Sequence, residues 1–249
     1  MISFKLLTAP SLALALLSAP SPAQAADPKP DQEPPQIFFL ECAGRRVPVD
    51  LDKPFRTDVL AGAKTATLRV EPHRVFRYAG LVFHYPREYT FEASLASPAV
   101  AVWTLAGSDC TIMVQRYPGR QDADAVRREF VGDLTALYQG AKTKQTDATC
   151  KLKHTTLKGL RLEVELAGRL LYQDLFCFPA GKDLVVLILQ DSPQRDGQPS
   201  PDRTRAEKML HDTLRLPGQP ENPPGPPPIP RFARSDLPHR LPRSPLSHP

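Results

Sequence analysis

Proline is distributed unevenly along this chain, and that distribution limits where a folded core can lie. Of the 29 prolines, 12 fall in residues 217–249, which contain the run PPGPPPIP. Proline fixes φ and lacks an amide hydrogen, so such a run favours extended polyproline II structure. We expect a disordered tail; the alternative is a segment that a partner protein binds. Residues 26–36 (ADPKPDQEPPQ) form a shorter linker of the same kind. We therefore expect one globular domain over residues 37–216.

The first 25 residues have the layout of a secretory signal peptide. Lys5 supplies a positive start, residues 6–17 are apolar, and Ala23 and Ala25 are small residues at positions −3 and −1 before a cut. The apolar run of about 12 residues is too short to span a bilayer core of roughly 30 Å. We expect cleavage after Ala25, export to the periplasm or the extracellular space, and no transmembrane anchor in the mature protein.

The basic composition does not indicate a nucleic-acid-binding protein. The net charge is +5, of which residues 1–25 carry +1 and residues 217–249 carry +2, so +2 remains on the body. A nucleic-acid surface would show Lys and Arg clustered on one face. We expect no nucleic-acid partner and, instead, another protein of the cell envelope; the oligomeric state is left open.

The cysteines all lie in the expected domain. In an exported protein an even number predicts disulfides, here two, with three pairings allowed by the sequence. Free thiols and a metal site are the alternatives. Close C-x₂-C or H-x₃-H spacing is missing, so we predict no metal site, and the lack of a CxxC pair argues against a thioredoxin-like redox enzyme. The disulfide candidates are Cys42, Cys110, Cys150 and Cys177.

Hydrophobic periodicity divides the body into strands and two helices. Residues 122–139 place apolar side chains at helical spacing behind a capping Asp122, and a second helix is expected over 201–214, with Pro201 at its first position. Alternating or continuous apolar runs predict strands, with hairpin turns at residues 79–80 and 107–109. The expected strands cover 37–40, 46–51, 64–70, 75–78, 81–85, 99–105, 111–117, 150–155, 160–166, 169–178 and 183–190. This order predicts an α+β domain in which helices cover an antiparallel sheet.

Three segments carry a resemblance to a known superfamily. Residues 78–86 (YAGLVFHYP) form a strand that ends in a proline turn, residues 157–159 (LKG) precede the meander, and residues 209–214 (MLHDTL) lie in the closing helix. From Arg77 to Leu216 the chain resembles the PsbP/DcrB-like superfamily, which includes nuclear-import Ran-release factors and actinobacterial cell-wall lipoproteins. The resemblance implies an α/β/α sandwich. Residues 37–73 are not part of the pattern of this superfamily, and they indicate either an extra N-terminal β unit or a different fold. It also implies a non-enzymatic role, since such domains bind proteins or assist envelope and photosystem assemblies.

No sequence motif indicates an enzyme class. HExxH, GxSxG, the phosphate-binding GxxxxGK[ST] and GxGxxG are all absent. Residues 107–110 (GSDC) superficially resemble a nucleophile elbow but fall in an expected hairpin turn. We predict no catalytic residue, no metal and no cofactor. An exported hydrolase with a dispersed active site and a small-ligand carrier with a closed apolar pocket are the alternatives.

Residues 73–89 (HRVFRYAGLVFHYPREY) combine arginine, tyrosine and histidine. Arginine and tyrosine are enriched in binding hot spots, and guanidinium groups also bind phosphate or carboxylate. The alternative is an edge strand kept soluble by its charges. A binding surface of the domain is expected here, made of Arg74, Arg77, Tyr78, His84, Tyr85, Arg87 and Tyr89. The leading hypothesis is an exported, non-enzymatic binding or scaffolding protein of the bacterial-type cell envelope.

Overall fold

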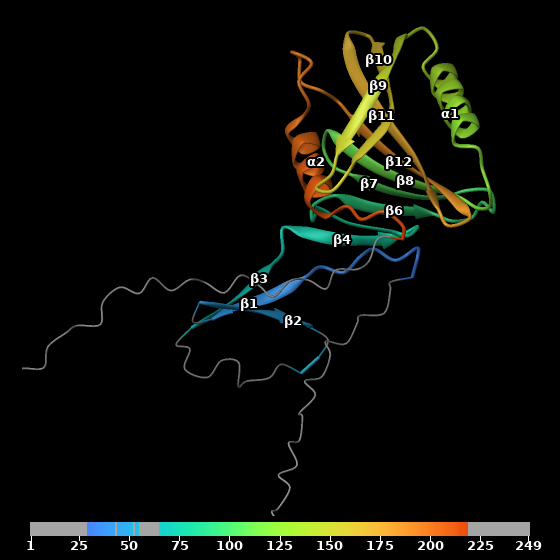
Figure 1. Cartoon of the computed structure of the whole chain (residues 1–249). Coiled ribbons are helices and arrows are strands. Elements are labelled where there is room, and N and C mark those ends of the chain that lie inside the picture. Colours follow the sequence, from blue (N-terminus) through green and yellow to red (C-terminus); the bar gives the residue numbers. More distant parts are fainter. Residues whose placement is uncertain (1–28, 43, 52, 55–64, 219–249) are drawn as a thin grey trace, which may run out of the picture. The chain divides into compact units, whose positions relative to one another are not determined.

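The computed structural model describes residues 29–42, 44–51, 53–54 and 65–218. The predicted signal peptide, its cleavage site, and all of the predicted tail except Pro217 and Gly218 lie outside these residues. The described part contains twelve strands and two helices, arranged in three antiparallel sheets (Figure 1).

Five strands between Phe38 and Pro86 form two small sheets. Strand β1 (Phe38–Cys42) pairs with β2 (Arg45–Val49) on one side and β3 (Ala66–Val70) on the other. Strands β4 (His73–Tyr78) and β5 (Leu81–Pro86) form a hairpin. Its two turn residues, Ala79 and Gly80, both have positive φ, at 54° and 74°, as a tight hairpin with right-handed strand twist requires. The strands and the turn predicted in this region are confirmed.

The main sheet has seven strands in the order β6-β7-β8-β12-β11-β10-β9. Its central strand β12 has seven successive buried residues, so the continuous apolar run expected at residues 183–190 is confirmed. The strands are β6 (Thr90–Ser94), β7 (Ala101–Ala106), β8 (Cys110–Tyr117), β9 (Lys142–Lys151), β10 (Thr156–Leu166), β11 (Arg169–Ala180) and β12 (Asp183–Asp191).

Both predicted helices are present, each with the expected cap. Helix α1 (Ala123–Leu137) begins after Asp122, whose carboxylate accepts a hydrogen bond from the Asp124 amide at 2.9 Å. Helix α2 (Pro201–Thr213) begins after Ser200, whose hydroxyl accepts one from the Arg203 amide at 3.0 Å. No helix in the described residues combines the length and apolar composition needed to cross a membrane.

Two clusters of buried side chains hold the main sheet and its neighbours together. The larger one joins aromatic residues of the β4–β5 hairpin to β7, β8, β12 and helix α2, and includes Phe76, Phe83 and Leu187, all fully buried. The smaller one joins Val126 of α1 to side chains of β11 and β12. The β4–β5 hairpin is therefore one wall of the core.

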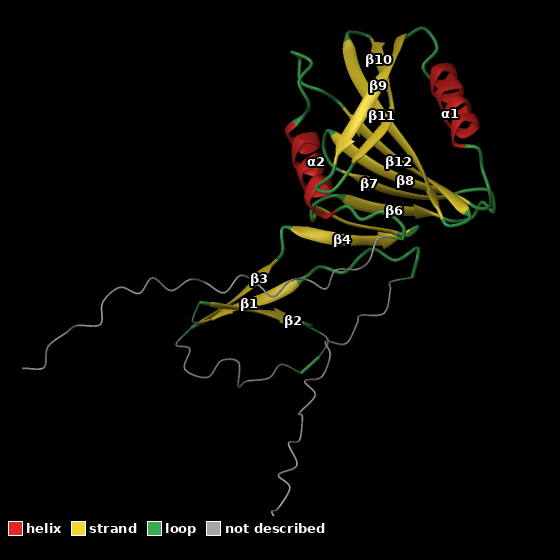
Figure 2. Ribbon diagram, in the orientation of Figure 1, coloured by secondary structure: helices red, strands yellow, loops and turns green. Residues whose placement is uncertain are grey.

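The predicted α/β/α sandwich is wrong. Strands make up 50% of the described residues and helices 16%, so the protein is mostly antiparallel β structure (Figure 2). The prediction placed helices over both faces of the sheet. Instead the β4–β5 hairpin contributes large aromatic side chains to the core, while only Val126 and Val131 of α1 are buried.

Candidate functional site

Strand alternation separates the seven residues predicted to form a binding surface. In β4, Arg74 and Tyr78 share the buried face with Phe76, whereas Arg77 on the opposite face is exposed. The exposed fractions of the four buried members are 8% for Arg74, 5% for Tyr78, 0% for Tyr85 and 2% for Tyr89. His84 and Arg87 are half-buried. The seven residues are thus near one another along one hairpin but do not form a single exposed surface.

The buried face of this hairpin binds the proline-containing segment that precedes the domain. The Trp103 indole Nε1–H of β7 donates a hydrogen bond of 2.7 Å to the carbonyl of Pro30, and the Tyr78 hydroxyl donates one to the carbonyl of Gln32. The Arg74 guanidinium forms an ion pair with Glu33. We call Arg74, Tyr78 and Trp103 the linker-binding surface, and residues 29–36 the docked segment.

The linker-binding surface is built on an aromatic cluster. The Tyr78 and Trp103 rings stack with centroids 5.7 Å apart and an interplanar angle of 8°. The Phe76 ring packs against both rings, with its centroid 5.0 Å from the Tyr78 ring centroid and 6.2 Å from the Trp103 ring centroid. Because the rings are packed, the polar tips of Tyr78 and Trp103 are held in place as donors. Burial, the main cause, raises the pKa of Tyr78 to about 12, so its hydroxyl stays protonated near neutral pH.

The docked segment presents the matching acceptors. It is not part of any strand; the Gln32 N–H donates to the Lys29 carbonyl at 2.8 Å and closes a turn, while the Pro30 and Gln32 carbonyls accept hydrogen bonds from the domain. Asp31, Gln32 and Glu33 are exposed, whereas Pro34 is buried. The prediction of a linker over residues 26–36 therefore missed that its second half binds the domain. Trp103 was also missed, although the alternation in residues 99–105 places it on the same strand face as Leu105.

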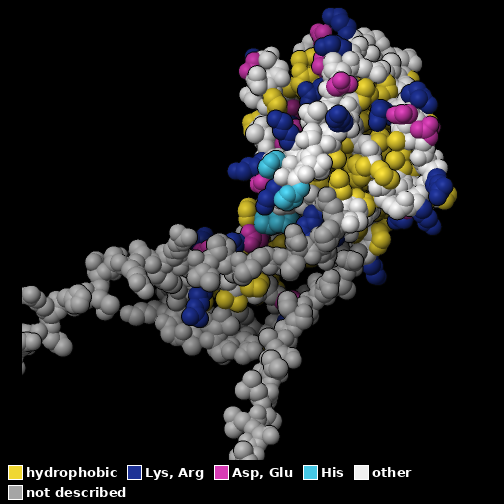
Figure 3. Space-filling model, in the orientation of Figure 1, with side chains coloured by type: hydrophobic (Ala, Val, Ile, Leu, Met, Phe, Trp, Pro, Cys, Tyr) yellow, Lys and Arg dark blue, Asp and Glu magenta, His cyan; other side chains and the backbone are white. Residues whose placement is uncertain are grey.

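The opposite face of the hairpin carries two stacked histidines. The His73 and His84 rings lie 4.1 Å apart and nearly parallel, at 9°. Burial, the main cause, and the neighbouring His73, Arg77 and Arg215 together lower the pKa of His84 to about 4. Figure 3 shows histidine side chains gathered beside lysine and arginine side chains on one face of the protein. Near neutral pH His84 is therefore uncharged and does not add to the positive charge of the neighbouring arginines.

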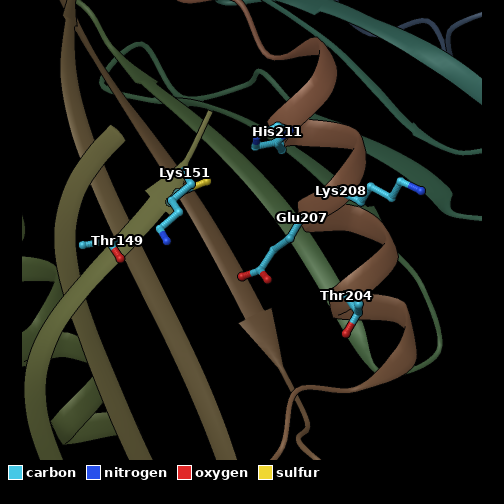
Figure 4. A pocket seen from close by; sticks show the side chains of 7 residues that line it. Thr149, Lys151, Thr204, Glu207, Lys208 and His211 are labelled. Carbon is cyan, nitrogen blue, oxygen red and sulfur yellow. The ribbon is translucent and has the colours of Figure 1, made fainter. Parts of the chain in front are cut away.

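A pocket of about 360 Å³ lies between α2 and β9 (Figure 4). The Glu207 carboxylate at its wall accepts a hydrogen bond of 2.8 Å from Arg203 Nε. Burial is the main cause that raises the pKa of the Cys150 thiol to about 11, and the Glu207 charge adds to it. The thiol is therefore protonated near neutral pH and is a poor nucleophile. The lining residues are Thr149, Cys150, Lys151, Thr204, Glu207, Lys208 and His211.

The other residues that the sequence singled out are the four cysteines and Ser108. Cys42, Cys110 and Cys150 are buried and Cys177 is half-buried, and the two disulfides expected among them stay a prediction. Ser108, in the turn compared with a nucleophile elbow, donates its backbone N–H to the Asp202 carboxylate at 2.8 Å. Across the described ranges, no group of three or more His, Cys, Asp or Glu side chains has a metal-binding arrangement.

Comparisons with known proteins do not identify a family. No protein-family model matches the chain, and no curated protein matches it significantly. Among solved structures, it is similar to PA94 from Pseudomonas aeruginosa, a protein of unknown function. That similarity has 15% sequence identity and a TM-score of 0.25, and covers 50% of this chain and 86% of PA94. The PsbP/DcrB-like resemblance stays a prediction.

Proposed function

We propose that this chain is an exported, non-enzymatic binding protein of the bacterial-type cell envelope, and that it holds a proline-containing polypeptide segment on its linker-binding surface. The observation that carries the proposal is the paired donation from Trp103 to the Pro30 carbonyl and from Tyr78 to the Gln32 carbonyl. Donors that are fixed by stacked rings and point to main-chain carbonyls are suited to holding a peptide. Export rests on the signal-peptide pattern of residues 1–25.

The chemistry of the α2–β9 pocket supports a binding role over a hydrolase. A hydrolase needs a nucleophile within reach of a base that can take its proton. Cys150 is held protonated by its raised pKa, and the Glu207 carboxylate is engaged by Arg203. The lining includes the charged side chains of Lys151, Glu207 and Lys208, unlike the closed apolar pocket that a small-ligand carrier requires.

Site-specific photo-crosslinking in the native envelope tests the proposal. A photoreactive amino acid replaces Asp31, which is exposed in the docked segment, in the full-length protein; a matched variant carries it at the exposed Gln121 before α1. We expect a heavier crosslinked species from position 31 and none from position 121. Absence of a crosslink at position 31 in the exported protein contradicts a binding role of this surface. N-terminal sequencing of the same sample tests export, with Ala26 expected as the first residue.

A further inference from the structure

We infer that the linker-binding surface recognises proline-containing turn segments that carry a carboxylate, and that the docked segment is its internal ligand, which a segment of a partner protein replaces. This inference rests on the proposed binding function and specifies the chemistry of the partner. Three features of the contact carry it: the turn whose carbonyls accept the two hydrogen bonds, the charge of Arg74, and the way in which the docked segment is attached.

The two donors contact a turn of the docked segment. The Gln32 N–H donates a hydrogen bond of 2.8 Å to the Lys29 carbonyl and closes a turn with Pro30 at its second position. The Pro30 carbonyl accepts a hydrogen bond from Trp103, and the Gln32 carbonyl accepts one from Tyr78. Proline at the second position of a turn fixes φ in advance, which lowers the entropy lost on binding.

The charge of Arg74 selects an acidic ligand. This arginine is only 8% exposed, and it forms an ion pair with Glu33 of the docked segment. A buried guanidinium without an anionic partner is strongly unfavourable. A replacing segment must therefore place a carboxylate one residue after its second accepting carbonyl, where Glu33 follows Gln32. The buried Pro34 adds a preference for proline at the next position.

The docked segment is attached in a way that permits exchange. Its residues belong to no strand, and Asp31, Gln32 and Glu33 remain exposed while bound. Its release breaks two side-chain hydrogen bonds and one ion pair but no strand pairing. The same chain contains a second sequence of this chemistry, since residues 219–228 (QPENPPGPPP) also combine a glutamate with successive prolines. That sequence serves as an alternative probe.

The test is a peptide titration followed by NMR at the indole N–H of Trp103, the one tryptophan in the sequence. The mature full-length chain with Glu33→Lys has a weakened internal ligand, because a lysine faces Arg74. The probe is a synthetic peptide with the sequence of residues 29–36. We expect the Glu33→Lys variant to bind it about tenfold more tightly than the wild type, because the tethered segment competes at a high effective concentration.

Matched controls separate peptide recognition from non-specific association. A peptide with lysine in place of the glutamate is expected to bind about tenfold more weakly, through loss of the pair with Arg74. Adding Tyr78→Phe to the Glu33→Lys protein removes one donor and keeps the ring, and is expected to weaken binding roughly fivefold. Thermal melting establishes that each variant is folded, and Glu33→Gln replaces Glu33→Lys if the latter is not.

Three outcomes overturn the inference. The first is that the chemical shift of the Trp103 indole N–H does not change when the peptide of residues 29–36 is added at millimolar concentration. The second is that the peptide with lysine in place of the glutamate changes this chemical shift equally. In either case a crosslink at position 31 would still support the proposed function, so the two failures are distinguishable. If the peptide of residues 219–228 binds more tightly than that of residues 29–36, the occupant is a segment of this chain and a separate partner is excluded.

Discussion

At the scale of single residues, Gly159 of β10 is required by the close approach of the neighbouring strand. A Cβ atom at this position would lie 2.1 Å from the Leu175 carbonyl oxygen and 2.7 Å from the Phe176 ring. The contact with backbone cannot be relieved by a side-chain rotation. Gly132 in α1 offers a matched comparison, since a Cβ there meets nothing within 4 Å and the residue is exposed.

We therefore predict opposite effects of the same substitution at these two glycines. Gly159→Ala is expected to lower the free energy of unfolding by about 2–4 kcal/mol, because β10 and β11 must move apart. Gly132→Ala is expected to raise it by roughly 0.5–1 kcal/mol through higher helix propensity. Urea denaturation of both variants measures this. A Gly159→Ala protein as stable as the wild type would contradict the strand spacing.

Also at the residue scale, His84 makes stability depend on pH. Its pKa in the folded protein is about 4, below the ordinary value of 6.5, mainly because it is buried and next because of His73, Arg77 and Arg215. The unfolded chain therefore binds a proton more readily than the folded one. The stabilising contribution is complete above pH 6.5 and is lost as the pH falls from 6.5 towards 4.

His84→Gln should remove this part of the pH dependence. We expect the wild type to lose roughly 2 kcal/mol more than the variant between pH 7 and pH 4. The backbone N–H of residue 84 donates to the Thr213 hydroxyl at 2.8 Å, a contact that the substitution retains. Denaturation curves at four pH values give the difference between the two slopes. Parallel curves would mean that His84 does not titrate in this range.

At the scale of elements, a buried charge cluster ties α2 to β11 and β12. Arg203 of α2 is 3% exposed and contacts the Asp174 carboxylate of β11 at 2.6 Å; Asp174 is 1% exposed. Arg203 also donates to the Leu189 carbonyl of β12 at 2.9 Å. Arg161 of β10 binds the same carboxylate through two hydrogen bonds, of 2.6 and 2.8 Å. One carboxylate therefore bridges two guanidinium groups.

Removal of that carboxylate should loosen α2 from the sheet. Asp174→Ala leaves Arg203 buried without its buried carboxylate partner, and we expect a loss of about 3–5 kcal/mol in the free energy of unfolding. Glu207→Ala is the control, because this second partner of Arg203 is 41% exposed and its loss should cost about 1 kcal/mol or less. Equal, small effects of both substitutions would argue against a stabilising role of the cluster.

Local patterns in the sequence were sufficient to predict the elements whose formation depends on residues close together in the chain. The α1 stripe with its Asp122 cap and the β4–β5 hairpin around Ala79 and Gly80 were predicted and are present. The first part of β9 was missed: it is an edge strand with mostly exposed residues, so it lacks the alternation by which strands are recognised. The sandwich prediction failed because sequence patterns do not tell which element covers a sheet.

The candidate site could be predicted only in part, for a related reason. The stretch containing Arg74 and Tyr78 was selected by composition, and both residues contact the docked segment. Trp103 and Glu33 lie far from it in sequence, and their contribution depends on tertiary contacts. Composition also could not distinguish buried members such as Tyr85 from the exposed Arg77, because that depends on which face of β4 and β5 meets the core.

At the scale of the whole molecule, the two proline-rich segments should differ in what they contribute to stability. Residues 29–36 supply the partners of Arg74, Tyr78 and Trp103, so their removal would expose two donors and leave a buried cation without its carboxylate. For residues 219–249, composition alone predicts little burial of apolar surface.

Two truncations of the mature chain measure this difference. A chain that starts at Ile37 is expected to lose about 2–4 kcal/mol in the free energy of unfolding, since it lacks the Arg74 ion pair and both side-chain hydrogen bonds. A chain that ends at Gly218 should stay within about 0.5 kcal/mol of the full mature protein. Urea unfolding followed by the fluorescence of Trp103 reports on both. If the chain that starts at Ile37 is as stable as the full mature protein, the docked segment does not stabilise the fold, and Arg74 must find another anion.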